Sequence, residues 1–296
     1  MKTEKNIGIA FILNAVFSLF ELVGGILIGS TAILSDAIHD AGDAVSIGMS
    51  YFLEKKSKKQ SDEIFTYGYT RYSVLGGLLT TLTLLLGSAI MIYNAVLRIF
   101  SPTQIDYNGM ILFAVVGVVV NLCAAYATHN AESLNQKAVN LHMFEDVLGW
   151  IVVLIGAIVM RFTNFALLDP LLSIAVSLYI LLHAIRNLKK ILDLFLQKSP
   201  INTSQLKDHL SAIDGVSDVH HIHLWSLDDH THCATLHVVT DHPPYAIKTA
   251  VRETLKEHGI AHATIETESP DETCAETECH VSPSATSCGG HHHHHH

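Results

Sequence analysis

The chain has 296 residues, of which 49% are hydrophobic and 16% are charged, whereas soluble proteins average about 25% charged residues. So few charges favour a protein of the lipid bilayer over one with a water-soluble core. The formal net charge of −10 argues against nucleic acid as a partner, because nucleic-acid binding needs a surface rich in Lys and Arg. The five cysteines are scattered and odd in number, so they do not predict a disulfide framework.

Six apolar segments are long enough to cross a bilayer, which takes roughly 20 residues. The first starts at Ile7 and is too long for the apolar part of a cleavable signal peptide, so we expect a membrane helix there. The first two segments must form a hairpin around a short Gly-Ser-Thr turn, because their joint length far exceeds one span. The predicted spans are residues 7–30, 31–53, 72–97, 110–128, 138–160 and 168–188.

The basic residues predict the orientation of these spans, since Lys and Arg collect in cytoplasmic loops. With six spans, Arg98 and Arg161 fall on the far side of the membrane. We therefore expect an integral protein of the cell (inner) membrane with both termini in the cytoplasm. The basic residues on the cytoplasmic side are Lys2, Lys5, Lys55, Lys56, Lys58, Lys59, Arg71, Lys137, Arg186, Lys189 and Lys190.

Near Ser199 the sequence changes to a pattern of alternating strands and shorter helices. Asn202 or Thr203 can cap a helix that runs to Ile213. The order helix–strand–strand–helix–strand predicts a small cytoplasmic ferredoxin-like α+β domain (αββαβ). A domain this small has little core, so pairing with a second copy in a homodimer would stabilise it. The predicted strands are residues 216–227, 233–240 and 263–268, and the second helix is residues 245–258.

These patterns divide the chain into four segments. Residues 1–198 are predicted to form the six-helix transmembrane domain, and residues 199–269 the small cytoplasmic domain. Residues 270–290 are rich in Pro, Asp, Glu, Thr, Ser and Cys and are predicted to be a disordered tail. The six histidines at 291–296 follow two glycines, which is typical of an expression tag.

Two of the predicted spans contain the same polar pattern, His-x-x-x-Asp. His39 and Asp43 lie in the second span, and His142 and Asp146 lie in the fifth. A spacing of four places both side chains on one helix face, one turn apart. Because the two spans run in opposite directions, each His can lie level with the Asp of the other span. The four side chains would form a His₂Asp₂ site that suits tetrahedral zinc, and its two carboxylates would offset the charge of the ion.

Other interpretations of these residues are open from the sequence. A single His–Asp pair could be a hydrogen bond between helices, and Asp36, one turn before His39, could support a ligand or guide ion entry. A membrane metalloenzyme would also bury His and carboxylate, but a zinc hydrolase keeps one coordination position open for water. Two His and two Asp would close the site. A membrane metal sensor would have no need of a site in the middle of the bilayer.

Histidines and carboxylates also collect on neighbouring predicted strands of the small domain, which is a pattern of metal sites. Strand alternation would place His221 and His223 on one face and His220 on the other, and His237 could join either set. The alternative is a group of unrelated surface histidines. The candidate zinc ligands are His220, His221, His223, His237, Glu266 and Glu268.

These residues belong to short motifs that are specific as a set. The motifs are Ser35-Asp36-Ala37-x-His39-x-x-x-Asp43, Tyr67-Gly68-Tyr69-x-Arg71, His142-x-x-x-Asp146, Asp169-Pro170, His220-x-x-His223-x-Trp225 and Thr264-Ile265-Glu266. Together they resemble signatures of the cation diffusion facilitator family over about residues 6–268. The resemblance implies a homodimeric secondary transporter that exports zinc or related ions in exchange for protons. The occurrence of His and Asp in both pairs resembles the pattern in the zinc-selective members of the family.

Two positions depart from the family pattern. Many members carry histidines in the loop after the second span, whereas this chain offers only Asp62 or Glu63 there, and Ser73 stands where Glu is common. Arg71 is retained. We expect it to pair with an acidic residue such as Asp193, as a charge lock between domains or subunits.

The sequence therefore predicts secondary-active efflux of zinc from the cytoplasm by alternating access. Cadmium and cobalt are alternative cargo ions. When zinc leaves, two carboxylates repel each other in a poorly solvated cavity, so the empty site should take up protons and carry them inward. Zinc would be the transported ion and, in the cytoplasmic domain, a regulator. The other expected partners are a second copy of the chain, protons and membrane lipid.

Overall fold

The computed structural model describes residues 2–28, 31–100, 107–130, 133–163 and 168–272. The predicted tail beyond Glu272 and the tag lie outside the described residues, as do the side chains of Asp36 and His39. The chain divides into a helical unit, which comprises the residues up to Leu196 together with Leu227–Asp229, and an α/β unit, which comprises the residues from Gln197 to Ser226 and from His230 onward. Each unit has its own hydrophobic core.

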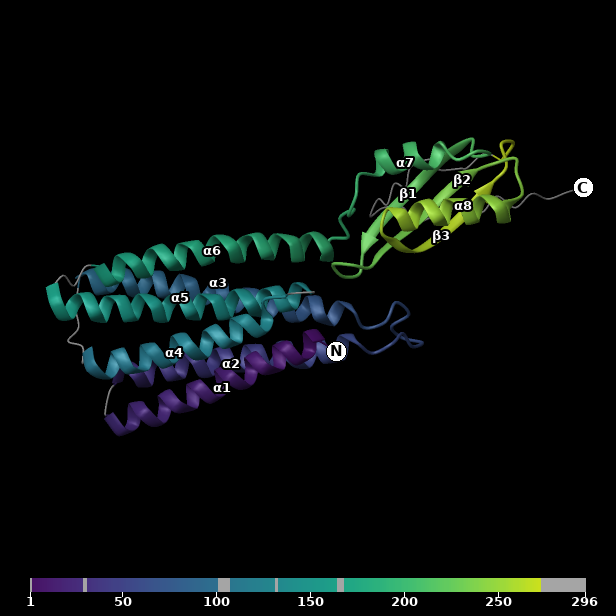
Figure 1. Cartoon of the computed structure of the whole chain (residues 1–296). Coiled ribbons are helices and arrows are strands. Elements are labelled where there is room, and N and C mark those ends of the chain that lie inside the picture. Colours follow the sequence, from purple (N-terminus) through teal and green to yellow (C-terminus); the bar gives the residue numbers. More distant parts are fainter. Residues whose placement is uncertain (1, 29–30, 101–106, 131–132, 164–167, 273–296) are drawn as a thin grey trace, which may run out of the picture. The chain divides into compact units, whose positions relative to one another are not determined.

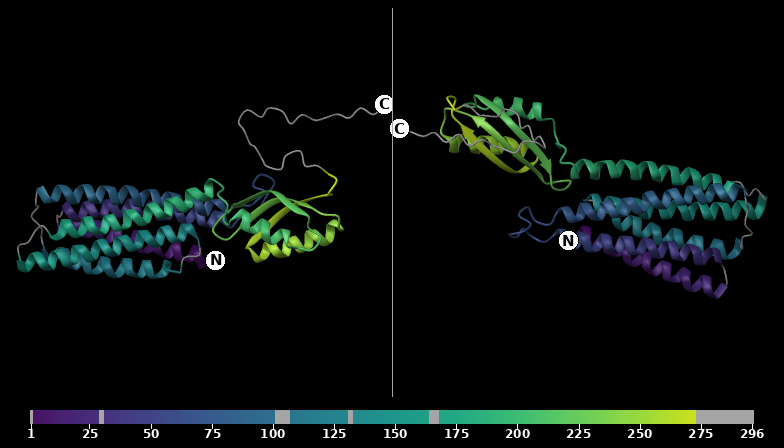
Figure 2. Two further views of the ribbon diagram at one scale, coloured as in Figure 1. Left: turned by 90° about the horizontal axis from the view of Figure 1, so that it is seen from above. Right: turned by 180° about the vertical axis from the view of Figure 1, so that it is seen from behind.

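Within the described residues, the helical unit consists of six long helices that run alongside one another (Figures 1 and 2). Each of them corresponds to one of the six apolar segments found in the sequence, with residues 29 and 30 of the first segment outside the described residues. They are α1 (Lys2–Ile28), α2 (Thr31–Ser57), α3 (Arg71–Phe100), α4 (Tyr107–Thr128), α5 (Leu134–Thr163) and α6 (Leu168–Phe195).

Four of these helices are long and apolar enough to cross a membrane by length and composition, among the residues that the structure describes. Their apolar stretches are Lys5–Gly24, Arg71–Leu97, Ile111–Thr128 and Leu134–Gly156. The other two helices are less apolar because of their charged residues. Asp36, Asp40 and Asp43 lie in α2, and the second half of α6 contains three basic residues and Asp193. Of the charges that lower the hydropathy of α2, Asp43 belongs to the predicted metal site.

Large apolar side chains project outward from the bundle as well as inward. Val45 and Phe52 of α2 and Leu86 of α3 are each more than 60% exposed, and the other four helices carry exposed Leu, Ile, Val or Tyr side chains in the same way. Such broad apolar surfaces are rare on soluble proteins. They fit a bundle whose outer surface contacts lipid.

Helix α5 packs against each of the other five helices of the bundle. Its residues Val139, Met143 and Val147 share a buried core with Ile7 of α1 and Ile47 of α2. Small residues permit these close contacts: a Cβ atom on Gly117 of α4 would lie 2.5 Å from the ring of Trp150 in α5. This packing places the polar face of α5 against α2 and α3.

A buried polar network joins α2, α3 and α5 near the α2–α3 loop. Ser73 Oγ donates to Glu54 Oε2 at 2.6 Å, and Asn135 Nδ2 donates to the same oxygen at 3.2 Å. Asn135 also bonds Ser50 through its Nδ2 and its Oδ1. A Cβ atom on Gly76 would lie 2.8 Å from the Asn135 amide, so the network requires a glycine on α3. Ser73, which departs from the family pattern, thus bonds a carboxylate from the neighbouring helix.

The α/β unit has the predicted order of elements. It contains α7 (Thr203–Ser211), β1 (Asp218–Ser226), β2 (His232–Val239), α8 (Pro244–Glu257) and β3 (Ile260–Glu268). The helix cap is confirmed, because Asn202 Oδ1 accepts from Ser204 N at 2.9 Å. Strands β1 and β2 are antiparallel, and β2 and β3 are parallel. The sheet order is β1-β2-β3.

Both helices of this unit cover the same face of the sheet. Leu206 and Leu210 of α7 and Val251 of α8 share one buried cluster with Val219 of β1 and Leu236 of β2. Side chains alternate across a strand, so His220 and His237, which follow Val219 and Leu236, lie on the opposite face. Among the described residues of this unit, both helices lie on the other face.

Strict alternation fails in the middle of β1. The register against β2 shifts between His220 and His223, and His221 has a positive φ of 53°. The prediction that His220 and His221 point to opposite faces is therefore wrong: the His221 ring lies 4.8 Å and the His220 ring 5.5 Å from the ring of His237, between centroids. A β-bulge inserts one residue and redirects the side chains that follow.

Candidate metal sites

The first candidate site lies inside the helical bundle. The structure brings together Asp43 of α2 with His142 and Asp146 of α5, with one ligand atom from each lying within 4.8 Å of the others. His142 Nε2 lies 3.5 Å from Asp43 Oδ2 and 3.9 Å from Asp146 Oδ2. Their side chains are 4%, 5% and 15% exposed for His142, Asp43 and Asp146, respectively. The predicted i,i+4 spacing on α5 and the approach of α2 to α5 are both present.

The His142 ring has the properties of an incomplete metal site. Neither of its nitrogens has a hydrogen-bond partner among the described residues, although buried polar side chains are nearly always hydrogen-bonded. Its Nε2 instead faces two carboxylates at distances longer than a hydrogen bond. A divalent cation between these three groups would satisfy the ring nitrogen and compensate both carboxylates.

The fourth predicted ligand, His39, lies one helical turn before Asp43. Its backbone is part of α2, but its side chain lies outside the described residues, as does that of Asp36. Their roles stay predictions.

Glu145, next to Asp146, is held by a different helix. Its Oε1 accepts a hydrogen bond from Ser88 Oγ of α3 at 2.9 Å. Adjacent residues on a helix point about 100° apart, so the two carboxylates on α5 serve different neighbours. This agrees with the interpretation that Asp146, and not Glu145, is on the ligand face.

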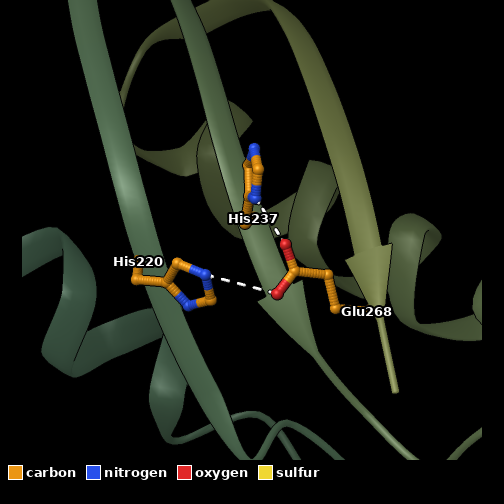
Figure 3. Close-up of side chains that lie close together, drawn as sticks. All are labelled: His220, His237 and Glu268. Atoms are coloured by element: carbon orange, nitrogen blue, oxygen red, sulfur yellow. Dashed lines mark hydrogen bonds and ion pairs between the residues drawn. The ribbon is translucent and has the colours of Figure 1, made fainter. Parts of the chain in front are cut away.

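The second candidate site lies in the α/β unit, on the sheet face opposite to α7 and α8. The carboxylate of Glu268 on β3 points toward both His220 of β1 and His237 of β2 (Figure 3). Its Oε1 lies 2.6 Å from His237 Nδ1, and its Oε2 lies 3.3 Å from His220 Nε2. The Glu268 side chain is only 7% exposed. Three strands thus contribute one ligand each.

A residue that sequence reasoning missed, Asp218, orients the His220 ring. Its Oδ2 lies 3.2 Å from His220 Nδ1, so Nδ1 carries the proton in a neutral ring and Nε2 presents a lone pair. That lone pair faces Glu268 Oε2, and both atoms are buried without a hydrogen-bond partner among the described residues. Two facing acceptors are unfavourable unless a cation lies between them. Metal-binding histidines are commonly oriented by a carboxylate in this way. The sequence signal that could have identified Asp218 is its position two residues before His220 on the same strand.

Asp218 is itself held in the ionised form. Partial burial works against ionisation, but the Lys207 ammonium, 3.1 Å away, holds the pKa of the Asp218 carboxyl below its ordinary value. The negative charge that orients His220 therefore persists across the neutral range.

The remaining predicted ligands of the domain surround this core. Glu266 Oε2 lies 3.3 Å from His237 Nε2, although the Glu266 side chain is 68% exposed. The His221 and His223 rings lie 5.1 Å apart between centroids. The structure therefore gathers all six predicted residues on one side of the sheet, with His220, His237 and Glu268 as the tightest group.

The α2–α3 loop does not offer its one well-placed carboxylate to a metal. Asp62 Oδ1 accepts from the backbone of Ile64 and Phe65, and its Oδ2 lies 2.8 Å from Lys59 Nζ and 2.7 Å from Tyr69 Oη. The Lys59 ammonium holds the pKa of Asp62 well below its ordinary value, and the same pair raises the pKa of Lys59. Both oxygens of the Asp62 carboxylate are therefore bonded within the loop.

Arg71 and Asp193, the predicted charge lock, lie on two helices that pack together. Arg71 begins α3, and Val74 of that helix shares a buried cluster with Ile191 and Leu194 of α6. Arg71 Nε is buried without a hydrogen-bond partner among the described residues. The charge lock stays a prediction.

A bundle of long apolar helices with a buried Asp–His–Asp cluster, followed by an α/β unit with a His–Glu cluster, defines the class of membrane proteins that handle metal cations. The comparison with known families agrees. The cation efflux transmembrane domain matches residues 7–196, and the cytoplasmic domain of cation efflux proteins matches residues 199–270. The chain belongs to the cation efflux family, and it is a transport protein of the membrane, not an enzyme.

Several curated proteins are similar to this chain over most of its length. The metal cation efflux system protein CzcD of Cupriavidus metallidurans is 32% identical over 274 residues, covering 90% of this chain and 86% of that protein. The zinc transporter ZitB of Pectobacterium atrosepticum is 32% identical over 285 residues, covering 93% and 88%. The cadmium, cobalt and zinc/H(+)-K(+) antiporter of Bacillus subtilis is 28% identical over 296 residues, covering 96% and 93%.

Proposed function

We propose that this protein exports zinc from the cytoplasm in exchange for protons, by alternating access at the cluster of His39, Asp43, His142 and Asp146. The observation that carries the proposal is the buried His142 ring, which faces two carboxylates on two helices and makes no hydrogen bond to a described residue. Among the similar proteins, ZitB of Pectobacterium atrosepticum is named as a zinc transporter. The Bacillus subtilis protein is named as an antiporter of cadmium, cobalt and zinc against protons and potassium. Cadmium and cobalt are therefore further candidate cargo ions.

The proposed topology has six spans, with residues 1–198 in the membrane domain and residues 199–269 in the cytoplasmic domain. Helices α2 and α6 have 27 and 28 residues, which makes each about 40 Å long, enough for a hydrocarbon core of about 30 Å. The charges of α2 are tolerable in a span because those of the cluster face the bundle interior. Both termini would lie in the cytoplasm of a bacterial inner-membrane protein.

Proton exchange follows from the make-up of the cluster. Metal ligands must be deprotonated to bind, so arriving zinc displaces any proton that the imidazole and carboxylates carry. After zinc leaves on the far side, the cluster takes up protons and returns with them, because unpaired charges are costly in a bilayer. Each cycle then moves zinc outward and protons inward.

The cytoplasmic domain is proposed to act as a homodimer that zinc regulates through His220, His221, His223, His237, Glu266 and Glu268. Zinc between facing acceptors would link the three strands and shift the population of transporter states. Arg71 and Asp193 are proposed as the charge lock that transmits or resists this shift. The packing of α3 on α6 supports the pairing.

Zinc flux into proteoliposomes tests the exchange. In molecules whose cytoplasmic side faces outward, zinc entry should make the lumen more alkaline, and an acidic lumen should accelerate zinc entry. A lumenal zinc indicator and a pH indicator report both, and liposomes with the Asp43→Ala variant give the background. Zinc flux that neither changes lumenal pH nor responds to a pH gradient would contradict proton exchange, while flux itself would still support transport.

A further inference from the structure

Two histidines on the helical side of the cytoplasmic domain contact each other directly. His209 lies in the last turn of α7, and His258 is the residue that caps the C-terminus of α8. His209 Nδ1 lies 2.8 Å from His258 Nε2, and the two rings lie 5.0 Å apart between centroids. The helices cover one sheet face, whereas the His220–His237–Glu268 cluster lies on the other. The pair is therefore separate from both candidate sites described above.

The His258 ring is oriented by its own helix. Its Nδ1 lies 2.9 Å from the carbonyl oxygen of Thr254, and a carbonyl can only accept, so Nδ1 carries a proton. The His258 backbone is also held, since its N–H bonds Leu255 O at 3.1 Å and Gly259 ends the helix with a φ of 78°. In a neutral ring, Nε2 then presents its lone pair. A backbone carbonyl that fixes the ring and tautomer is the arrangement found behind metal-binding histidines.

His209 completes a pair of imidazole nitrogens that one ion can reach. In the structure His209 Nδ1 is the donor to His258 Nε2, because the latter accepts. If the His209 proton moves to Nε2 by exchange with solvent, both facing nitrogens become lone-pair donors. Two nitrogens on one tetrahedral zinc ion are about 3.3 Å apart, so the 2.8 Å pair needs to open by roughly half an ångström. His209 is exposed and can rotate that far.

The location also favours a cation. Both histidines stand at helix C-termini, where unsatisfied carbonyls give the helix a partial negative charge. We propose that His209 and His258 form a second, two-imidazole site of the cytoplasmic domain for a borderline divalent transition metal such as zinc. Water fills the other coordination positions. With two protein ligands it binds more weakly than the three-strand cluster, and the bound ion links α7 to α8.

Residue-specific chemical labelling of the full-length protein tests this site. The protein is purified in detergent with residues 291–296 removed, so that the tag binds no metal, and is treated with diethyl pyrocarbonate over a zinc chloride titration. Mass spectrometry of peptides then reports the reactivity of each histidine. His209 and His258 should become protected together, at zinc concentrations above those that protect His220 and His237.

Substitution of either partner distinguishes metal binding from a simple hydrogen bond. In His209→Gln, half-protection of His258 should require at least about tenfold more zinc, and His258→Gln should do the same to His209. His242→Gln is the matched control, because His242 is an exposed histidine of the same domain that lies near Asp241. It should leave the protection of His258 unchanged. Reactivity of His258 that does not respond to millimolar zinc, or that responds equally in His209→Gln, would overturn the proposal.

Discussion

The bundle cluster and the sheet cluster use the same two side-chain types but hold them differently. In the bundle, His142 Nε2 stands 3.5 and 3.9 Å from its carboxylates and makes no hydrogen bond to a described residue. In the sheet, Glu268 bonds His237 Nδ1 at 2.6 Å, and Asp218 orients His220. The sheet ligands are thus ordered by bonds among themselves, whereas no hydrogen bond to a described residue orients the His142 ring of the bundle.

This difference fits the two proposed tasks. A transport site must release its ion in each cycle, so ligands on separate helices that can move apart are suitable. A regulatory site needs to bind its ion above a set zinc concentration. Ligand side chains that already have bonded partners lose little conformational entropy when the ion binds. The α2–α3 loop is a third case, in which Asp62 is already satisfied by Lys59, Tyr69 and the backbone.

The largest expected effect is the loss of one carboxylate in the bundle. Asp146→Asn should lower zinc flux by about 100-fold or more, because loss of a ligand exceeds the 10–100-fold cost of losing an outer partner, and it leaves the ion incompletely compensated. Zinc entry into proteoliposomes measures this. Glu145→Gln is the matched control: it changes the adjacent carboxylate, which accepts from Ser88, and flux should stay within about twofold. Equal losses in both variants would contradict the assignment of Asp146 as a ligand.

A smaller effect is expected in the sheet. His237→Ala should raise the zinc concentration needed for half-maximal flux by about tenfold while leaving flux at saturating zinc largely intact, because this cluster is proposed to regulate transport and does not carry it. His242→Ala is the control for removal of a histidine. A complete loss of flux in His237→Ala at all zinc concentrations would contradict the regulatory role.

The smallest effect is expected in the loop. Asp62→Asn keeps an oxygen for the backbone of Ile64 and Phe65 but loses the ion pair with Lys59, whereas Asp62→Ala loses both. Amide hydrogen exchange at residues 64 and 65 should be faster in Asp62→Ala than in Asp62→Asn, and zinc flux should be unchanged in both. Loss of flux in Asp62→Asn would instead assign this carboxylate to ion handling.

The pH dependence of the loop has a definite sign. The pKa of Asp62 is lowered in the folded protein, so its contribution to stability is fully present above the ordinary Asp value of about 3.9 and is lost only as the pH falls toward the lower, folded value. Exchange protection of the loop in the unchanged protein, corrected for the intrinsic rate, should therefore be constant between about pH 5 and 8.

Much of the molecule follows from the sequence alone. Apolar length predicts the helices, because the bilayer thickness sets how many residues a span needs. The His-x-x-x-Asp spacing predicts that His142 and Asp146 share a face, since a helix returns to the same side after four residues. The order αββαβ and the Asn202 cap follow from alternation and capping chemistry, which are local.

The tertiary structure decided the features that depend on residues far apart in the chain. A bulge in β1 brings His220 and His221 together near His237, and the contact of Glu54 with Ser73 and Asn135 needs three helices in register. The sequence leaves Asp62 as a candidate metal ligand, but in the structure both of its carboxylate oxygens are bonded within the loop. His209 contacts His258 only because α7 and α8 pack on one sheet face. Sequence periodicity reports which face of an element a residue occupies, but which faces meet, and at what height, depends on packing between elements that no local pattern encodes.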